Sequence, residues 1–302
     1  MAFPTRARLA ALLTVPAVSM VVLAGCGDDD PKATDPGDRP SQSGKPSTSP
    51  SQGGDPSPTE SGSATPTTVA APLYFVGETP QGPRLFREFQ QVEADNPVDE
   101  ALAVLTAGAA KDPDYRSLLP EGTPTLVQGD NGEAIGVNIP VEWADRPSGM
   151  SAKEATLAIQ QIVFTVQGVL QSRAPVEFYS DGLTPVFGVD KSSFKAAQRA
   201  LALVNVTQPE EGSSPGDSFT ASGVANSFEA TVPWEVRDQD GKKVLDGFST
   251  AEGWGDKLYP WQTEVDVSSL PPGTYSFVAM TDDPSGGEGG GPTEDSKTIT
   301  VQ

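Results

Sequence analysis

Few types of residue in this 302-residue chain could act in catalysis or bind a metal, because it has no histidine and only one cysteine. Histidine is the usual general base of serine and cysteine hydrolases and a common zinc ligand, so its absence excludes those enzymes and His-ligated zinc sites. One cysteine allows neither an internal disulfide nor a cysteine cluster for a metal. We therefore expect a protein that is not an enzyme and has no cofactor.

Ser192 and Lys195 have the S-x-x-K spacing in which a lysine activates a serine nucleophile. The companion motifs of such enzymes, S-D-N and K-T-G, are absent, and residues 297–299 read "KTI". We interpret the segment instead as the start of a helix after Asp190. Carboxylate pairs for glycoside hydrolysis are available by residue type, but the sequence fixes no two of them at a set separation.

The glycine-rich stretch "DDPSGGEGGGPTED" near the end of the chain is a candidate ion or phosphate loop. It lacks the Gly-Lys-Ser/Thr ending of a phosphate-binding loop. Asp283 and Glu294 stand at the first and twelfth positions of a calcium loop, but the third and fifth positions hold Ser285 and Gly287. We expect a long hairpin connection and no metal site; a partner that orders the loop on binding is the alternative.

The formal net charge of −21 argues against nucleic acid and anionic lipid headgroups as ligands of the folded part. Trp254 and Tyr259 are the candidates for contacting a partner or the sugars of a cell-wall polymer, because aromatic rings stack on sugar rings. Packing of the two rings within a loop is the competing interpretation. The alternation of "WQTEVDV" places Trp261 in the core.

The first 25 residues have a basic start and an apolar run, which is the layout of a secretory signal peptide. Leu23-Ala24-Gly25-Cys26 resembles the bacterial lipobox. This resemblance implies cleavage between Gly25 and Cys26 and attachment of acyl chains, palmitate among them, to Cys26. Two or three such chains suffice for stable anchoring. We expect the protein on the outer face of the cytoplasmic membrane, held there by its lipid.

Residues 26–72 are expected to form a disordered tether. Of the 46 residues from 27 to 72, 29 are Pro, Gly, Ser or Thr. A segment with so few apolar side chains cannot offset the entropy of ordering. It would hold a folded body away from a membrane.

Residues 73–200 predict an α+β domain with a mixed sheet and two helices. Strands are expected at "PLYFVGE" and "PRLFREFQQV", and a hairpin from "TLVQ" to "EAIGVNI". One helix begins at Asn96-Pro97 and the other at Ser151, which forms a capping box with Glu154. A further hairpin is expected around Asp181-Gly182, with Pro185 restricting its second arm to a sheet edge. Residues 201–302 contain seven short strands, which suits an all-β sandwich with its own core.

The first of these regions resembles the GerMN domain of sporulation and spore-germination proteins. The resemblance rests on "LYFV", "DEALAVLTAG", "LLPEGTPTL", "GEAIGVNI" and "LAIQQIVFTVQGVLQSRAPVEFYSDG". The chain departs from the family pattern at "AGAA" and at Asn138, where an acid is usual, so a role tied to that acid does not carry over. The second region is similar to the immunoglobulin-like domain of bacterial spore germination in "SFEATVPWEVRDQDGKKVLDGF", "LPPGTYSF" and "DDPSGGEGGGPTEDSKTITV".

These resemblances imply a bacterial lipoprotein, of actinobacterial type, that is not an enzyme. We expect it to act as an extracytoplasmic adaptor or scaffold for other proteins of the cell envelope, with the membrane contacted through its N-terminal lipid. The alternative is a module that binds cell-wall polymer or a small ligand through loops of the C-terminal sandwich. Nucleic acid is not an expected partner.

Overall fold

The computed structural model describes residues 67–182, 184–283, 286–288 and 290–302. The predicted signal peptide, lipidation at Cys26 and the tether up to residue 66 lie outside these residues. Residues 62–302 form one compact unit. Among the described helices, none has both the length and the apolar character that crossing a membrane requires.

The chain first forms a two-stranded antiparallel ribbon from β1 (Thr68–Gly77) and β2 (Arg84–Glu93). Strand β1 begins at Thr68, so the expectation that the tether extends to residue 72 is wrong. The reason is the partner strand: all ten residues of β1 have a partner on β2, with Val69 opposite Val92. Ala71 is already buried in the core.

Helix α1 (Pro97–Thr106) and helix α2 (Ala152–Val169) begin where the sequence predicts. The capping box is confirmed: the Glu154 amide donates to Ser151 Oγ at 3.2 Å, and the Ser151 amide donates to Glu154 Oε2 at 2.8 Å. Pro97 occupies the first turn of α1, but the side chain of Asn96 makes no capping hydrogen bond. The apolar face of α1 is buried as expected, through Val98, Ala101, Leu102 and Leu105.

A mixed four-stranded sheet follows, in the order β3-β4-β5-β6. Its strands are β3 (Thr125–Gln128), β4 (Ile135–Asn138), β5 (Val176–Tyr179) and β6 (Ser193–Phe194). The β3–β4 hairpin is confirmed, and β5 runs parallel to β4.

The hairpin predicted around Asp181-Gly182 is wrong, because β5 forms its antiparallel ladder with β6. The segment after the turn contributes one hydrogen bond to β5, from the Thr184 amide to the Phe178 carbonyl at 3.0 Å. The helix expected to begin after Asp190 is also wrong, because this segment forms strand β6. Pairing with β6 places Val176 opposite Phe194, and both side chains are buried. The segment after Pro185 bonds elsewhere, since the Phe187 amide donates a hydrogen bond to the Trp143 carbonyl.

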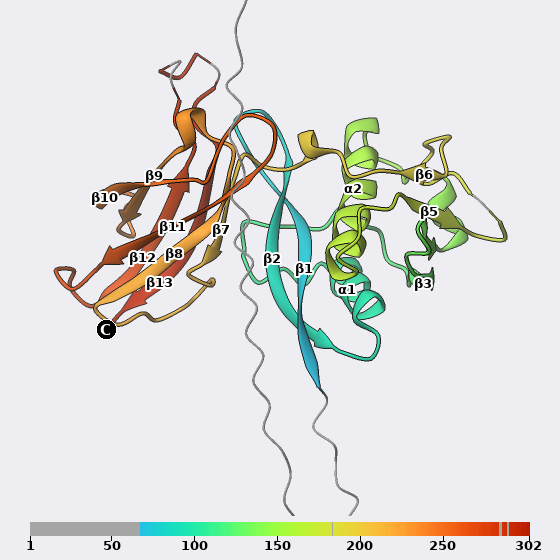
Figure 1. Ribbon diagram of the computed structural model, residues 1–302, viewed down its shortest axis with the longest axis horizontal. Helices are drawn as coiled ribbons and strands as arrows, with labels where there is room; N and C mark the ends of the chain where they lie inside the picture. Colours follow the sequence, from blue (N-terminus) through green and yellow to red (C-terminus); the bar gives the residue numbers. More distant parts are fainter. Residues whose placement is uncertain (1–66, 183, 284–285, 289) are drawn as a thin grey trace, which may run out of the picture. The chain divides into compact units, whose positions relative to one another are not determined.

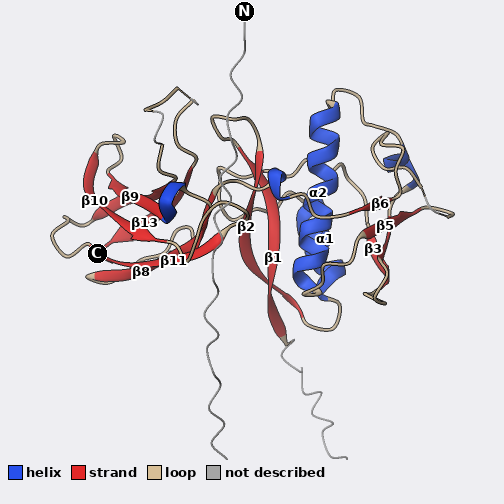
Figure 2. Cartoon of the chain, turned by 45° about the horizontal axis from the view of Figure 1, so that its top comes forward, coloured by secondary structure: helices blue, strands red, loops and turns tan. Residues whose placement is uncertain are grey.

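The two helices lie between the β1–β2 ribbon and the four-stranded sheet (Figure 1), and the turned view shows the same layers (Figure 2). Helix α2 packs chiefly on β1, while α1 contacts α2, β1 and β3. The prediction of an α+β fold with a mixed sheet and two helices is therefore confirmed, with the correction that the ribbon is a separate sheet. A short 3₁₀ helix, η1 (Val141–Ala144), contributes the buried Trp143.

The remaining strands form the predicted sandwich of immunoglobulin-like type, with sheets β10-β9-β12-β13 and β11-β8-β7. The strands are β7 (Val204–Gln208), β8 (Ser218–Ala225), β9 (Thr231–Arg237), β10 (Lys243–Thr250), β11 (Tyr259–Asp266), β12 (Gly273–Met280) and β13 (Glu294–Val301). Trp261, Val265 and Val267 are buried, as their alternation predicts. Two short 3₁₀ helices, η2 (Gln198–Ala200) and η3 (Phe228–Ala230), lie in connections.

The apolar core has one cluster drawn from residues 71–202 and another from residues 204–301. We call the described residues up to Ala202 the first half and those from Leu203 the second half. A smaller cluster of Val76, Leu85, Leu157 and Phe164 packs against Leu201, where the chain passes from one half to the other.

Candidate functional site

Strand β13 carries a lysine and an aspartate on its buried face. In β13 the odd-numbered residues are buried, so Asp295 and Lys297 are in phase with the core residues Ile299 and Val301. A β-strand alternates its side chains between two faces, which accounts for this placement. Only 4% of the Lys297 side chain is exposed to solvent. A charge buried to this degree is costly unless it is paired and hydrogen-bonded.

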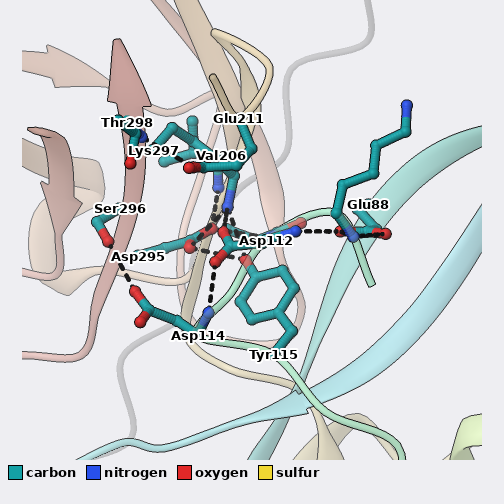
Figure 3. A network of polar contacts seen from close by, with 12 residues as sticks. Glu88, Asp112, Asp114, Tyr115, Val206, Glu211, Asp295, Ser296, Lys297 and Thr298 are labelled. Atoms are coloured by element: carbon teal, nitrogen blue, oxygen red, sulfur yellow. Dashed lines mark hydrogen bonds and ion pairs between the residues drawn. The ribbon is translucent and has the colours of Figure 1, made fainter. Parts of the chain in front are cut away.

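The ammonium group of Lys297 has three oxygen partners, which Figure 3 shows converging on it. Its Nζ lies 2.5 Å from Asp112 Oδ2 and 3.1 Å from Asp295 Oδ1. It also lies 2.9 Å from the hydroxyl oxygen of Tyr115. All three donor positions of the ammonium are therefore occupied. We call Asp112, Tyr115, Asp295 and Lys297 the Lys297 cluster.

Asp295 is the most highly connected member of the Lys297 cluster. Besides the lysine, its carboxylate accepts hydrogen bonds from the Tyr115 hydroxyl at 2.7 Å and from Asn205 Nδ2 at 2.9 Å. It also accepts one from the backbone amide of Val206 at 2.6 Å. The carboxylate thus joins β13 to β7 and to the first half at one point.

The first half positions its share of the cluster with the segment from residue 109 to residue 116, which follows α1. Arg116 exchanges two backbone hydrogen bonds with Val76 of β1, at 2.8 and 2.9 Å. The Asp112 carboxylate accepts a hydrogen bond from the backbone amide of Asp114 at 2.9 Å, which fixes its position in this segment. The Tyr115 ring stacks on Phe86 of β2 with 5.2 Å between ring centroids. Both side chains are therefore also held by contacts within the first half.

The electrostatics of the cluster favour a charged lysine and a neutral tyrosine. Burial lowers the pKa of Lys297, but Asp295 and Asp112 more than offset this, so the net shift is upward. Burial, followed by the charges of Asp295 and Asp112, raises the pKa of Tyr115 well above its usual value. Burial also raises the pKa of Asp112, which Lys297 partly opposes.

The contacts of the Lys297 cluster join the surfaces of the two halves and do not activate the lysine as a nucleophile. A lysine that attacks or abstracts protons needs a lowered pKa, whereas the pKa of Lys297 is raised. Each of the four side chains of the cluster has at least one partner across the boundary between the halves. The arrangement therefore acts as a polar clamp.

Further contacts join the halves beyond the clamp. The Ser296 hydroxyl of β13 donates a hydrogen bond to Asp114 Oδ2 at 3.2 Å. In the β1–β2 turn, Gln81 Nε2 donates to the Gly291 carbonyl at 3.3 Å, and the Thr293 hydroxyl donates to Gln81 Oε1 at 3.3 Å. The glycine-rich connection between β12 and β13 thus contacts the first half.

The two weak calcium candidates have other roles. Glu294 is the first residue of β13 and accepts two hydrogen bonds, both at 3.0 Å, from the guanidinium of Arg237. Asp283 accepts from the Gly287 amide at 2.7 Å. Within the described part of the chain, no three His, Cys, Asp or Glu side chains come together as metal ligands. The predicted hairpin connection is confirmed by the pairing of β12 with β13.

The two aromatic candidates, Trp254 and Tyr259, have different surroundings. Trp254 is 51% exposed and packs edge-to-face on Phe228, with 5.2 Å between centroids. The Tyr259 hydroxyl donates to Asp256 at 2.6 Å, and Lys257 Nζ lies 4.9 Å from its ring centroid. Trp254 and Phe228, which is 40% exposed, form an accessible aromatic pair.

Ser192 and Lys195 flank the extended strand β6 instead of lying on one turn of a helix. Three residues of extended chain span about 10 Å, which is too far for the lysine to activate the serine. The geometry thus agrees with the rejection of this motif, although the predicted helix is absent.

Sequence reasoning missed the Lys297 cluster. Asp112, in "KDPDY", and Asp295 and Lys297, in "TEDSKTITV", look like solvated charges. The available signal was the strand phase, because the two charged residues of β13 alternate together with Ile299 and Val301. No comparable signal marks Asp112 or Tyr115, whose burial depends on the second half.

Comparisons with known proteins agree with the two halves. Residues 72–186 match the profile of the family described as sporulation and spore germination. Residues 203–288 match the family described as the immunoglobulin-like domain of bacterial spore germination. No curated protein matches the chain.

Solved structures give weaker likenesses. The tandem GerMN domains of the sporulation protein GerM from Bacillus subtilis align with 67% of this chain at 13% identity and a TM-score of 0.36. The chain spans 62% of that structure. CopC from Methylosinus trichosporium OB3b aligns with 33% of this chain, and 93% of its own, at 18% identity and a TM-score of 0.22. We infer nothing from scores this low.

Proposed function

We propose that this chain, in which a sporulation and spore-germination domain precedes an immunoglobulin-like domain of bacterial spore germination, is a non-catalytic adaptor between components of the cell envelope. The observation that supports this role is the Lys297 cluster. A buried network that spans two domains favours one orientation between them, because its directional ion pairs and hydrogen bonds form together only in that orientation. The two domain surfaces are thus presented in one orientation.

A fixed orientation suits an adaptor. Two partners that bind different domains of one rigid body are held at a defined distance and angle. Flexibly linked domains instead behave by default as independently moving bodies. Within this proposal the protein binds other proteins, has no substrate, and lies on the outer face of the cytoplasmic membrane.

The anchor in this proposal is a lipid on Cys26. Changing Cys26→Ser removes the thiol that would receive the diacylglyceryl group, so we expect the variant to remain unprocessed or to leave the membrane fraction. Fractionation and intact-mass spectrometry distinguish the mature lipidated form from the precursor. A variant that stays both mature in size and membrane-bound would show that Cys26 is not the anchor.

Crosslinking mass spectrometry in intact cells tests the adaptor role. We expect crosslinks from Lys191 in the first half and from Lys257 in the second half, both exposed, to envelope proteins. The variant Lys297→Met should lose complexes that engage both halves, whereas Lys243→Met, which changes an exposed lysine, should keep them. Crosslinks confined to copies of this chain, or unchanged complexes in Lys297→Met, would contradict the proposal.

A second candidate function rests on the exposed pair of Trp254 and Phe228. Exposed aromatic rings stack on sugar rings, so this surface favours contact with cell-wall polymer. Sedimentation of residues 62–302 with insoluble peptidoglycan, beside the variant Trp254→Ala, separates the two functions. A wild-type protein that stays in the supernatant would remove this candidate and leave the adaptor role intact.

A further inference from the structure

One face of the first half is basic, although the chain carries 41 acidic side chains. Three neighbouring hollows of about 510, 490 and 190 Å³ lie along this face, and the smallest reaches the boundary, where Asn205, Val224 and Leu258 of the second half also line it. None of the residues that line them is Asp or Glu. We call this face the basic strip; its cations are Arg84, Arg87, Lys153, Arg173, Lys195 and Arg199.

The basic strip follows helix α2 along its length. Lys153 and Leu157, near the start of α2, line the first hollow, and Phe164 and Gln171 line the second. The 18 residues of α2 correspond to a length of about 27 Å. The segment 195–200 borders both hollows, since Arg199 lines the first and Lys195 the second. The strip is therefore long enough for several units of an extended polymer.

The cations of the strip have no acidic partners. Within the described residues, none of the six takes part in an ion pair, whereas Arg116, Arg237, Lys243 and Lys297 all do. Glu154, the acid next to Lys153 in sequence, is not paired with it; its carboxylate accepts a hydrogen bond from the Ser151 amide in the capping box. Arg84 donates a hydrogen bond to the Pro83 carbonyl and Arg87 donates one to the Thr207 hydroxyl, both of which are neutral groups. Six cations without acidic partners leave a local positive field that an anion could neutralise.

The overall negative charge does not cancel this local attraction. At physiological ionic strength the Debye length is about 8 Å, so charges on distant surfaces are largely screened. The argument from net charge against anionic ligands therefore does not extend to this strip. A ligand that lies in the hollows is governed mainly by the nearest cations.

The surface between the cations is apolar. Leu157, Ala197 and Ala200 line the first hollow. Tyr74 and Phe164, with ring centroids 5.1 Å apart, line the second. Cations alternating with apolar surface complement a chain in which phosphates alternate with polyol or sugar carbons. A planar membrane fits less well, because these groups line hollows.

We propose that the basic strip binds an anionic polymer of the cell envelope whose repeating units are joined by phosphodiesters. Arg84, Lys153 and Arg199 bind successive phosphates, and Lys195 with Arg173 continues the path along α2. Arginine and lysine bind phosphate by charge-assisted hydrogen bonds. This inference concerns a surface that neither function proposed above uses, so it does not depend on them.

The test uses residues 62–302, which form one compact unit, and a fluorescently labelled synthetic glycerol-phosphate oligomer. Fluorescence anisotropy should give saturable binding that weakens as salt rises. Changing Arg84, Lys153 and Arg199 together to Gln should raise Kd at least about tenfold, since such binding is mostly electrostatic. The matched control changes Lys242, Lys243 and Lys257 to Gln, which alters the net charge equally, and should leave Kd within about twofold.

Three outcomes would overturn the proposal. They are absence of oligomer binding by the wild-type protein, equal weakening by the two triple variants, and binding to phosphatidylglycerol vesicles without binding to the oligomer. The melting temperature of each variant is measured alongside. If the first triple variant is unfolded, the single change Lys153→Gln on the exposed side of α2 replaces it, with an expected loss of about threefold and the single change Lys257→Gln as its control.

Discussion

Replacing Lys297 with methionine is expected to destabilise residues 62–302 by about 3–5 kcal/mol. Methionine has a similar length and fills the space, but it leaves the carboxylates of Asp112 and Asp295 buried without their cation. Removing one partner of a buried charge network is costly because the remaining charge is desolvated and uncompensated. Urea unfolding followed by circular dichroism measures the change in the free energy of unfolding.

Two controls identify the cause of this loss. Lys243→Met removes a lysine that is half exposed and pairs with Glu235 and Asp246 at 3.8 and 3.5 Å, so it should change stability by no more than about 1 kcal/mol. Adding Asp112→Asn to Lys297→Met removes one of the stranded charges and should restore part of the stability. A Lys297→Met variant as stable as Lys243→Met would mean that the network is not a clamp.

The second large effect is expected at alkaline pH. The pKa values of Lys297 and Tyr115 are raised in the folded protein, so the folded state keeps two protons that the unfolded chain releases above about pH 10. Stability is therefore fully present below that pH and falls as the pH rises through it. Each proton contributes a slope of about 1.4 kcal/mol per pH unit, or about 2.7 for both.

Variants of the cluster show how much of this pH dependence of stability comes from Lys297 and Tyr115. Burial also raises the pKa of Tyr74, so the informative quantity is the difference between wild type and variant. Tyr115→Phe should lose about half of the cluster's slope, and Lys297→Met should lose the contribution of the lysine. Unfolding titrations in urea at several pH values supply the comparison. Equal slopes in all three proteins would refute the assigned protonation states.

Much of the fold could be predicted because its signals are local. Three of these signals depend only on residues close in sequence. They are the capping box of Ser151 and Glu154, the proline at the start of α1, and the alternation around Trp261. The seven strands of the sandwich follow from the same alternation and from the turns between them. These signals do not depend on which parts of the chain come together later.

The features that escaped prediction depend on distant residues. Strand β5 pairs in parallel with β4 and antiparallel with β6, which contains Phe194. The sequence instead suggested a hairpin with the segment after the nearby turn. The early start of β1 depends on the full length of β2. The Lys297 cluster joins residues about 180 positions apart, such as Tyr115 and Asp295, so local patterns can mark at most one side of it.

Differential scanning calorimetry of residues 62–302 tests most directly whether the clamp makes one rigid unit of the two domains. We expect a single transition in which the calorimetric enthalpy equals the van't Hoff enthalpy, as for a two-state protein. The Lys297→Met variant should separate into two transitions, because each domain retains its own apolar core. Two resolved transitions in the wild-type protein would contradict the account.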